Sequence, residues 1–168
     1  MTNIYAGFMT QCKKMKAATN FIDFFVHDIL DFTVLEERAE NFTKNLTVFD
    51  VREAIDQILV MMEDKVNLQE ILVRTRYLNF DESGYMIKTD MKRFQQVLLN
   101  LYSNAIKFTQ NQGKITIEVE KEDGMLLIKV IDNGTGIRKR NQNKMFQMFG
   151  TIKEDNPQGI GLGLCICK

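Results

Sequence analysis

The chain has 168 residues, which is enough for one ordinary core and an appended element but not for two full domains. Lys and Arg together number 22, and so do Asp and Glu, so the formal net charge is zero. No global field would therefore hold the protein on nucleic acid or on an anionic membrane, and any phosphate binding must be local.

The cysteine content and the hydropathy indicate the kind of cellular compartment in which the chain acts. Cys12, Cys165 and Cys167 fit neither a zinc site nor a disulfide framework, which favours a reducing environment. The amino-terminal residues lack an apolar signal core, and no stretch reaches the roughly 18 uncharged apolar residues of a spanning helix. We expect a soluble, cytoplasmic chain with any membrane anchor in segments outside it, and we interpret Cys165 and Cys167 as core residues.

Apolar residues recur every three or four positions through the first segment, which predicts an amphipathic helix with a heptad seam. The seam consists of Ile4, Phe8, Met15, Ala18, Ile22, Phe25, Ile29 and Phe32. Such a helix must bury its stripe against another chain, a missing helix or its own domain. The polar run EERAENFTKN then breaks the seam near Glu40. The sequence thus predicts a helical segment over residues 1–40 and a separate α/β unit over residues 41–168.

The second unit mixes strand and helix patterns. LTVFD alternates as a short strand, VREAIDQILVMMEDK has helical periodicity, and residues 66–88 are ambiguous apart from a turn at DESG. Asp90 can cap a helix that runs to about Phe108, and KITIEVEKEDGMLLIKVID is typical of a β-hairpin. Residues 133–163 form a long, weakly apolar loop, which is usually functional or mobile. These patterns indicate an α+β fold.

Polar side chains form one stripe on the helix that begins after Asp90, because three- and four-residue steps follow the helical turn. The stripe consists of Arg93, Gln96, Asn100, Asn104 and Lys107. Asparagine offers a neutral oxygen suited to Mg²⁺, and lysine offers a point charge for phosphate. A solvated helix face would show the same pattern, and the stripe alone does not decide between the two.

Two glycine-rich segments follow. The hairpin ends in IDNGTGI at residues 131–137, and GIGLGL occupies residues 159–164. Glycines permit positive φ and close backbone approach to a ligand, and a glycine run that opens a helix directs free N–H groups at an anion. Either segment alone is also typical of an ordinary turn or of packing.

The order of these pieces closely resembles the catalytic domain of sensor histidine kinases. The pattern D-x-x-R-x-x-Q-V-L-x-N-L-x-x-N-A-x-K-F-T is followed by DNGxGI, then MFQMF, then GxGLGL. These blocks are similar to the family's N, first glycine, phenylalanine and second glycine boxes. The resemblance implies a Bergerat-type two-layer α/β sandwich with a mixed sheet, preceded by a long dimerisation-type helix. This sandwich is shared with gyrase B, heat-shock chaperones of the ninety-kilodalton class and MutL, and ATP lies between the helices and a lid.

The resemblance also implies roles for individual side chains. Asn104 would coordinate Mg²⁺, Asn100 would assist at the phosphates and the metal, and Lys107 would contact the phosphates. Asp132 would accept a hydrogen bond from the adenine amino group, with Phe108 bordering the base. The remaining implied nucleotide-binding residues lie in the glycine boxes and the lid: Gly134, Gly136, Ile137, Phe146, Phe149, Gly159, Gly161, Gly163 and Leu164.

The amino-terminal helix resembles one half of the family's dimerisation hairpin. VHDILDFTVLE is similar to its second helix, and His27 stands where that helix usually has Asn. His27 lacks the Arg and Pro that follow the usual phosphoacceptor, so we expect the acceptor on another helix or on a partner chain. The resemblance implies a homodimeric full-length kinase, with a response regulator receiver domain as the next phosphate acceptor and no nucleic-acid partner.

The sequence also departs from the family pattern. Arg138, Lys139 and Arg140 replace the usual proline and acidic residue at the start of the lid, and they either attract phosphate or are simply solvated. Family members continue beyond the second glycine box, so we expect the domain to be incomplete at its carboxyl end. Two alternatives therefore stay open: a degenerate nucleotide-binding or dimerisation module, and another Bergerat ATPase. The latter usually carries a general-base Glu where this chain has Asn100.

Overall fold

The computed structural model describes residues 7–9, 11, 12, 15, 19, 22, 44–80, 84–142, 145, 164 and 167. The elements in chain order are β1 (Leu46–Asp50), α2 (Val51–Leu68), β2 (Leu72–Leu78), β3 (Met86–Asp90), α3 (Met91–Phe108), β4 (Lys114–Glu122), β5 (Met125–Asp132) and α4 (Lys139–Gln142). The described residues before position 23 are helical and exposed. Most of the expected heptad helix, with His27 and the boundary near Glu40, lies outside the described residues, so the seam and the domain limits stay predictions.

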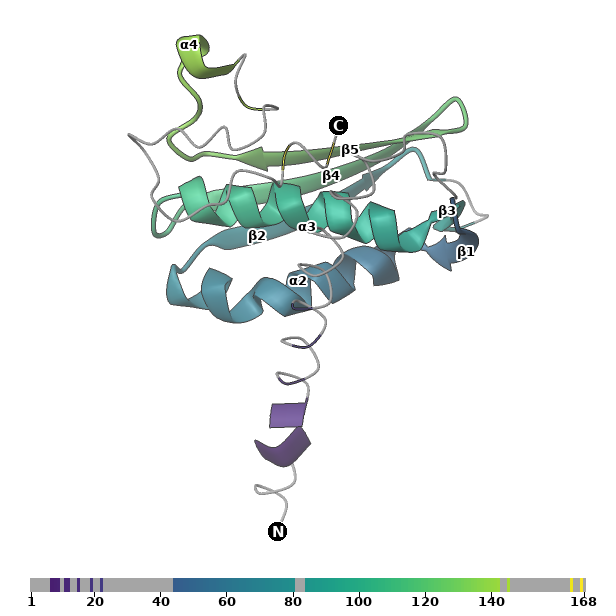
Figure 1. Cartoon of the computed structure of the whole chain (residues 1–168), viewed down its shortest axis with the longest axis horizontal. Coiled ribbons are helices and arrows are strands. Elements are labelled where there is room, and N and C mark those ends of the chain that lie inside the picture. Colours follow the sequence, from purple (N-terminus) through teal and green to yellow (C-terminus); the bar gives the residue numbers. More distant parts are fainter. Residues whose placement is uncertain are drawn as a thin grey trace, which may run out of the picture.

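Three strands form a mixed sheet in the order β2-β4-β5. The central strand β4 pairs in parallel with β2 and antiparallel with β5. A second, two-stranded sheet consists of antiparallel β1 and β3. Figure 1 shows α2 and α3 side by side on one face of the larger sheet, with β1 and β3 gathered at one end. The predicted α+β fold with a mixed sheet is confirmed.

Aspartates begin both long helices. The Asp50 carboxylate accepts a hydrogen bond from the Arg52 N–H at 2.8 Å, and Asp90 accepts from the Arg93 N–H at 3.2 Å. Such caps satisfy amide groups that have no partner within the helix. Asp90 also accepts from the Asn45 N–H at 2.9 Å, which ties the start of α3 to the residue before β1. The predicted cap at Asp90 is confirmed, and α3 ends at Phe108 as expected.

The core lies between the helices and one face of the larger sheet. Ile115, Ile117 and Val119 alternate along β4 and are fully buried, as are Ile55 and Ile58 on α2. Helix α3 adds further members, namely Leu98, Leu99, Tyr102, Ala105 and Ile106. Alternate residues of a strand point to opposite faces, so one face of β4 is apolar and the other is free for polar side chains.

The opposite face of the sheet carries a row of alternating charges. The register places Arg76, Glu118 and Lys129 beside one another on β2, β4 and β5. The Lys129 Nζ lies 3.0 Å from the Glu118 carboxylate, and the Arg76 guanidinium lies 3.7 Å from it. Hydrogen bonds to the carboxylates of Glu118, chiefly, and Glu120 raise the pKa of Lys129. The charged row marks the solvent side, and the helices cover the other side.

The segment that the sequence left ambiguous contributes β2, β3 and an aromatic cluster. The Tyr85 ring lies 5.2 Å from Tyr77 and 4.7 Å from Phe80, measured between centroids. The Arg52 guanidinium carbon lies 3.8 Å from the Tyr85 centroid. Desolvation by burial raises the pKa of Tyr77 to about 12. Aromatic packing thus holds the ends of β2 and β3 against the start of α2.

Across the described part of the chain, no helix combines the length and the apolar character that a bilayer crossing requires.

Candidate functional site

The polar stripe predicted on α3 is formed in the structure. Gln96 is buried, Asn100 and Asn104 are half-buried, and Lys107 is exposed on the last turn. The Asn100 Nδ2 atom is buried and has no hydrogen-bond partner among the described residues. The oxygen and nitrogen of an amide are exchangeable when a side chain is placed, so either atom can be the unsatisfied one. A buried amide without a partner is costly, and a bound ligand or ion would remove that cost.

The loop after β5 reaches the carboxyl end of α3. The Thr135 N–H donates to the Phe108 carbonyl at 3.2 Å. This bond satisfies one of the carbonyl groups that a helix leaves unpaired at its end. The structure therefore brings Asp132, at the end of β5, to the same end of the molecule as Asn104 and Lys107. The sequence could place these residues together only by resemblance to a family.

The register determines the side on which Asp132 lies. It stands opposite Ile115, whose side chain is buried beneath the helices, so Asp132 belongs to the helix-facing side of the sheet. Its Oδ1 atom accepts a hydrogen bond from the Gly134 N–H at 2.9 Å. The residue is exposed, and no hydrogen bond to its second oxygen is found among the described residues. One carboxylate oxygen thus shapes the loop, and the other is able to accept a hydrogen bond from a ligand.

Glycine is required at position 134, because there the backbone of the loop lies close to the backbone of α3 at Phe108. A Cβ atom at this position would lie 2.3 Å from the Phe108 carbonyl oxygen and 2.8 Å from its carbon. Gly136 differs, because nothing lies within 4 Å of its would-be Cβ and its φ is +66°. The first glycine allows the loop to lie against α3, and the second allows a left-handed backbone.

Two residues that the sequence reasoning did not select complete the junction. The Asn133 side-chain oxygen accepts a hydrogen bond from the Lys114 N–H at 2.7 Å. A Cβ at Gly113 would lie 2.9 Å from that same oxygen and 2.3 Å from the Thr109 methyl group. Asparagine commonly bonds nearby backbone at turns, so its place between Asp132 and Gly134 was the available signal. No sequence signal identified Gly113 as a site residue. In the structure its φ lies outside the left-handed region, so the position is restricted by space and not by backbone conformation.

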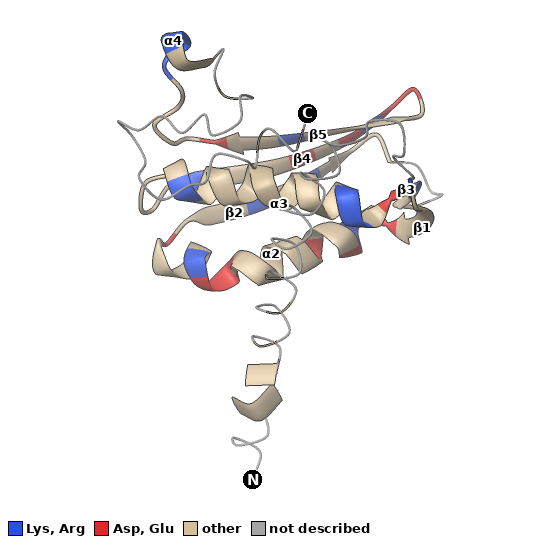
Figure 2. Cartoon of the chain, viewed as in Figure 1, with Lys and Arg blue, Asp and Glu red and all other residues tan. Residues whose placement is uncertain are grey.

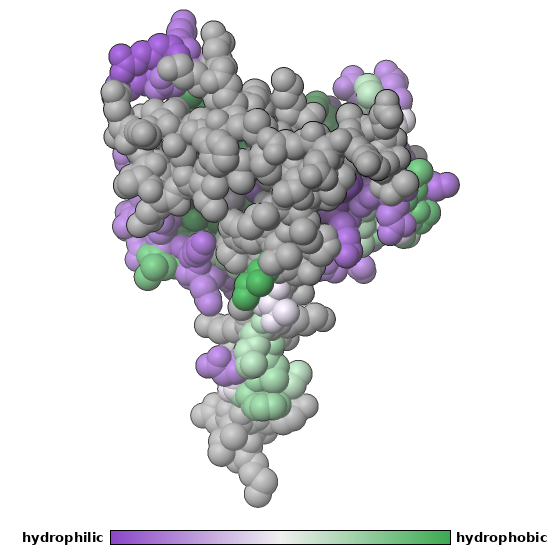
Figure 3. All heavy atoms as spheres, viewed as in Figure 1, coloured by the Kyte–Doolittle hydropathy of each residue, from purple (hydrophilic) through white to green (hydrophobic). Residues whose placement is uncertain are grey.

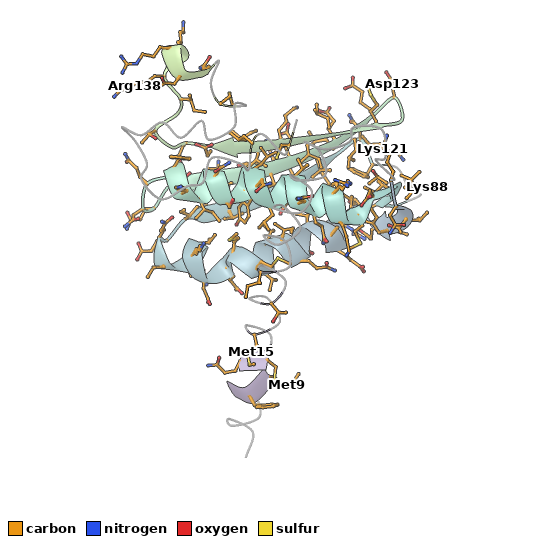
Figure 4. The ribbon with its side chains drawn as sticks, in the orientation of Figure 1. Met9, Met15, Lys88, Lys121, Asp123 and Arg138 are labelled. Carbon is orange, nitrogen blue, oxygen red and sulfur yellow. The ribbon has the colours of Figure 1, made fainter. Side chains whose placement is uncertain are left out.

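Basic residues lie at this end of the molecule as well as at the amino end of α3. Figure 2 shows basic segments at the carboxyl end of α3 and on α4, the end of the molecule at which β5 also ends. Figure 4 shows Arg138 beside α4, far from Lys88 and from Asp123 at the hairpin turn. The Lys107 Nζ lies 5.7 Å from the Phe108 ring centroid, and both residues are exposed. The exposed ammonium group of Lys107 suits an anionic ligand at the carboxyl end of α3.

Several predicted site residues lie in other places or are not described. Phe146, Phe149, Gly159, Gly161 and Gly163 lie outside the described residues. Ile137 is exposed, and its carbonyl accepts a hydrogen bond from the Gln142 amide at 3.2 Å. Leu164 is helical and half-buried. Cys167 is half-buried too, with its Sγ 4.0 Å from the Val97 carbonyl, whereas Cys165 is not described.

Among the described residues, no cluster of three His, Cys, Asp or Glu side chains could hold a metal ion. Amide oxygens are nevertheless suitable ligands for Mg²⁺, which is usually bound by few protein groups together with substrate phosphates and water. The half-buried amides of Asn100 and Asn104 fit this kind of site, because one of their atoms is buried without a partner.

The chain is similar to known proteins in sequence and in fold. A profile of the family described as histidine kinase-, DNA gyrase B- and HSP90-like ATPases matches residues 89–168. The circadian input-output histidine kinase CikA of Synechococcus elongatus is 32% identical over 146 residues, which cover 85% of this chain and 19% of CikA. The solved catalytic domain of histidine kinase ThkA is 32% identical, with a TM-score of 0.64, over 73% of this chain and 77% of that one. The chain belongs to the histidine kinase family.

The chain is also similar to ThkA solved in complex with the response regulator TrrA. That match has 25% identity and a TM-score of 0.60 over 78% of this chain and 37% of ThkA in the complex. The similarity to the isolated ThkA domain assigns this chain to the catalytic, ATPase-like part of the family and confirms the predicted Bergerat fold. The chain spans only 19% of the length of CikA.

A separate groove lies on the other half of α3. Its volume is about 480 Å³, and it is lined by Lys44, Leu46, Thr89, Asp90, Arg93, Phe94, Val97, Leu98, Leu101 and Ile128. Figure 3 shows hydrophobic atoms over the adjoining β1 and β3 strands, where Leu46, Val48 and Met86 are exposed. Most of the lining is apolar, and none of the predicted nucleotide-binding residues belongs to it. The chemistry of a phosphate ligand fits the end of α3 rather than this groove.

Proposed function

We propose that this chain is the catalytic module of a two-component sensor kinase, which transfers the γ-phosphoryl group of Mg-ATP to a histidine outside the chain. One observation carries the proposal: the hydrogen bond from the Thr135 N–H to the Phe108 carbonyl, at 3.2 Å. This bond joins the loop that carries Asp132 to the helix that carries Asn104 and Lys107. This contact supports a single ligand site that combines a base-recognising carboxylate with phosphate-binding groups.

Adenine recognition falls to Asp132 in this proposal. Its second carboxylate oxygen is available for the adenine amino group, because the first is held by the Gly134 N–H. Guanine presents a carbonyl at the corresponding position and would repel the carboxylate. Phe108, exposed at the end of α3, supplies an apolar border for the base. Hydrogen bonds to charged groups contribute more than neutral ones, which makes Asp132 the main determinant of base specificity.

The residues proposed to bind the phosphates lie in the second half of α3. Lys107 provides a cation, and Asn100 and Asn104 provide amide oxygens for Mg²⁺. The metal would neutralise charge on the phosphates when bound. We include Gly134, Gly136, Ile137, Leu164 and the lid residues Phe146, Phe149, Gly159, Gly161 and Gly163 in the nucleotide site on the strength of the family pattern.

The chain itself need not supply a nucleophile. Phosphoryl transfer depends on positioning and on charge stabilisation, so the module serves by holding ATP for an incoming imidazole. We propose that this imidazole lies on a dimerisation helix or a partner kinase chain rather than at His27. ThkA, which binds the response regulator TrrA, supports a receiver domain as the next acceptor. We further propose a homodimeric full-length kinase that acts in the cytoplasm.

The first test is calorimetric titration of the 168-residue chain with ATP, with and without Mg²⁺. We expect Mg²⁺-dependent binding that Asn104→Ala abolishes or greatly weakens, because a metal ligand is removed. Asp132→Ala should weaken ATP binding by about 1.5–3 kcal/mol and leave GTP binding nearly unchanged. Asn67→Ala, which removes an exposed asparagine side chain from α2, is the matched control. Equal ATP affinity in wild type and Asn104→Ala would refute the metal assignment.

The transfer step needs a second experiment. The chain is incubated with γ-labelled ATP, alone and together with a protein that carries a family-type phosphoacceptor helix. Acid-labile label should appear on the added helix only. Label on this chain that disappears in His27→Gln would show that His27 is the acceptor and would contradict the proposal.

A further inference from the structure

One side chain joins the amino end of β4 to the loop after β5. The β4–β5 register pairs Ile115 with Asp132, so Lys114 and Asn133 are the next opposite pair. The Asn133 N–H donates to the Lys114 carbonyl at 3.2 Å, as in an antiparallel ladder. The Lys114 N–H donates instead to the Asn133 side-chain oxygen, at 2.7 Å. The side-chain carbonyl of Asn133 thus replaces its own backbone carbonyl in the ladder.

This replacement allows β5 to end without leaving an unpaired amide on β4. The Asn133 backbone is released from the ladder on its carbonyl side and can turn away from the sheet. Two residues later the loop meets α3, where the Thr135 N–H donates to the Phe108 carbonyl. The side chain of Asn133 therefore fixes the point at which the chain leaves the sheet for the helix.

Two glycines make room for this arrangement. A Cβ at Gly113 would lie 2.9 Å from the Asn133 side-chain oxygen, and a Cβ at Gly134 would lie 2.3 Å from the Phe108 carbonyl oxygen. The Gly113 carbonyl in turn accepts from the Leu72 N–H at 2.9 Å, which anchors the turn before β4 to β2. The Asn133 side chain is thus held between a sheet edge and a turn that has no space for a larger residue.

We propose that Asn133 is a positioning residue for adenine recognition. It closes the end of the β4–β5 ladder with its side chain, holds the 133–135 loop against α3, and so orients the neighbouring Asp132 carboxylate. Asp132 Oδ1 bonds the Gly134 N–H within this loop, at 2.9 Å, so the loop sets the direction of the second oxygen. The proposal rests on the nucleotide site proposed above, and it adds to that site a residue that does not touch the nucleotide.

The test compares Asn133→Ala with Asn133→Asp, which keeps an acceptor oxygen at the same place. The first readout is hydrogen exchange of the Lys114 amide, which should lose protection in Asn133→Ala and keep it in Asn133→Asp. The second readout is the affinity for ATP and for GTP. Asn133→Ala should weaken ATP binding by about 2- to 12-fold, the range for one net hydrogen bond, and should change GTP binding less. Asn133→Asp should lie closer to wild type in ATP affinity.

The outcomes separate this inference from the proposed function. If wild type does not bind ATP, the nucleotide site itself is wrong. If wild type binds ATP and Asn133→Ala keeps the wild-type ratio of ATP to GTP affinity, Asn133 does not position Asp132. Unchanged protection of the Lys114 amide in Asn133→Ala would also overturn the inference. Asn133 is exposed, so the substitution leaves the core intact, and circular dichroism of each variant checks its folding.

Discussion

Substitution of Gly134 by alanine tests the junction between the loop and α3 most severely. The added Cβ would lie 2.3 Å from the Phe108 carbonyl oxygen and 2.8 Å from the Phe108 carbonyl carbon. Both atoms belong to the backbone of a helix end and cannot rotate away. Non-bonded carbon atoms rest at roughly 3.5 Å, so the loop must withdraw by about 1 Å.

This withdrawal removes the hydrogen bond between the Thr135 N–H and the Phe108 carbonyl, which is already 3.2 Å long. The lost bond costs about 0.5–1.5 kcal/mol. Residual steric strain adds about 1–3 kcal/mol, the usual scale for overpacking. We therefore expect Gly134→Ala to lower the free energy of unfolding by about 2–4 kcal/mol in urea denaturation.

Gly136→Ala is the matched control, because its would-be Cβ meets nothing within 4 Å and only its φ of +66° is unfavourable. Its cost should be about 1 kcal/mol. Hydrogen exchange distinguishes the two mechanisms: the Thr135 amide should lose protection in Gly134→Ala and keep it in Gly136→Ala. A Gly134→Ala variant that is no more destabilised than Gly136→Ala, or whose Thr135 amide stays protected, would refute the proposed clash.

Three further predictions concern stability, and each is checked by urea unfolding. The hydrogen bond from Arg52 holds the pKa of Asp50 below its usual 3.8, so the charged cap stabilises the fold above that pH and its contribution is lost as the pH falls through the lowered pKa. Asp50→Ala should cost about 0.5–2 kcal/mol near neutrality, and a loss that persists unchanged at pH 2 would contradict this account. Burial raises the pKa of Tyr102 to about 12, so wild type should lose stability from pH 10 upward as the unfolded chain ionises, and Tyr102→Phe should lose less. Ile117→Ala should cost about 2–5 kcal/mol because the side chain is fully buried, and a cost below 1 kcal/mol would show that the core is placed wrongly.

Local patterns were sufficient for most elements of the catalytic unit. The helix-capping role of Asp90 could be predicted from sequence, because the cap bonds an N–H only three residues further along the chain. The β4–β5 hairpin likewise follows from two alternating runs around a turn at Asp123 and Gly124. Both elements were predicted with nearly the observed ends, since the interactions that fix them lie close in the chain.

Pairing between segments that lie far apart in the sequence could not be predicted in the same way. Residues 66–88 contain β2, whose partner β4 begins at Lys114. Because the pairing partner is distant in the sequence, no local pattern predicts this strand. The site shows the same limit. The stripe on α3 could be predicted from helical spacing, but the contact between Thr135 and Phe108 joins two elements separated by the whole hairpin. Gly113 escaped notice because its would-be Cβ clashes with atoms that only the folded turn brings together: the Thr109 methyl group at 2.3 Å, the Gln110 carbonyl oxygen at 2.8 Å and the Asn133 side-chain oxygen at 2.9 Å.

The most direct test of the central claim is titration of the ¹⁵N-labelled chain with Mg-ATP, followed by nuclear magnetic resonance. We expect chemical-shift changes in the backbone amides of Gly134 and Thr135 and in the side-chain amide of Asn104. Leu46 and Val97, which line the apolar groove on the other half of α3, should stay unchanged. Shifts confined to Leu46 and Val97, with Gly134, Thr135 and Asn104 unaffected, would contradict the proposed nucleotide site.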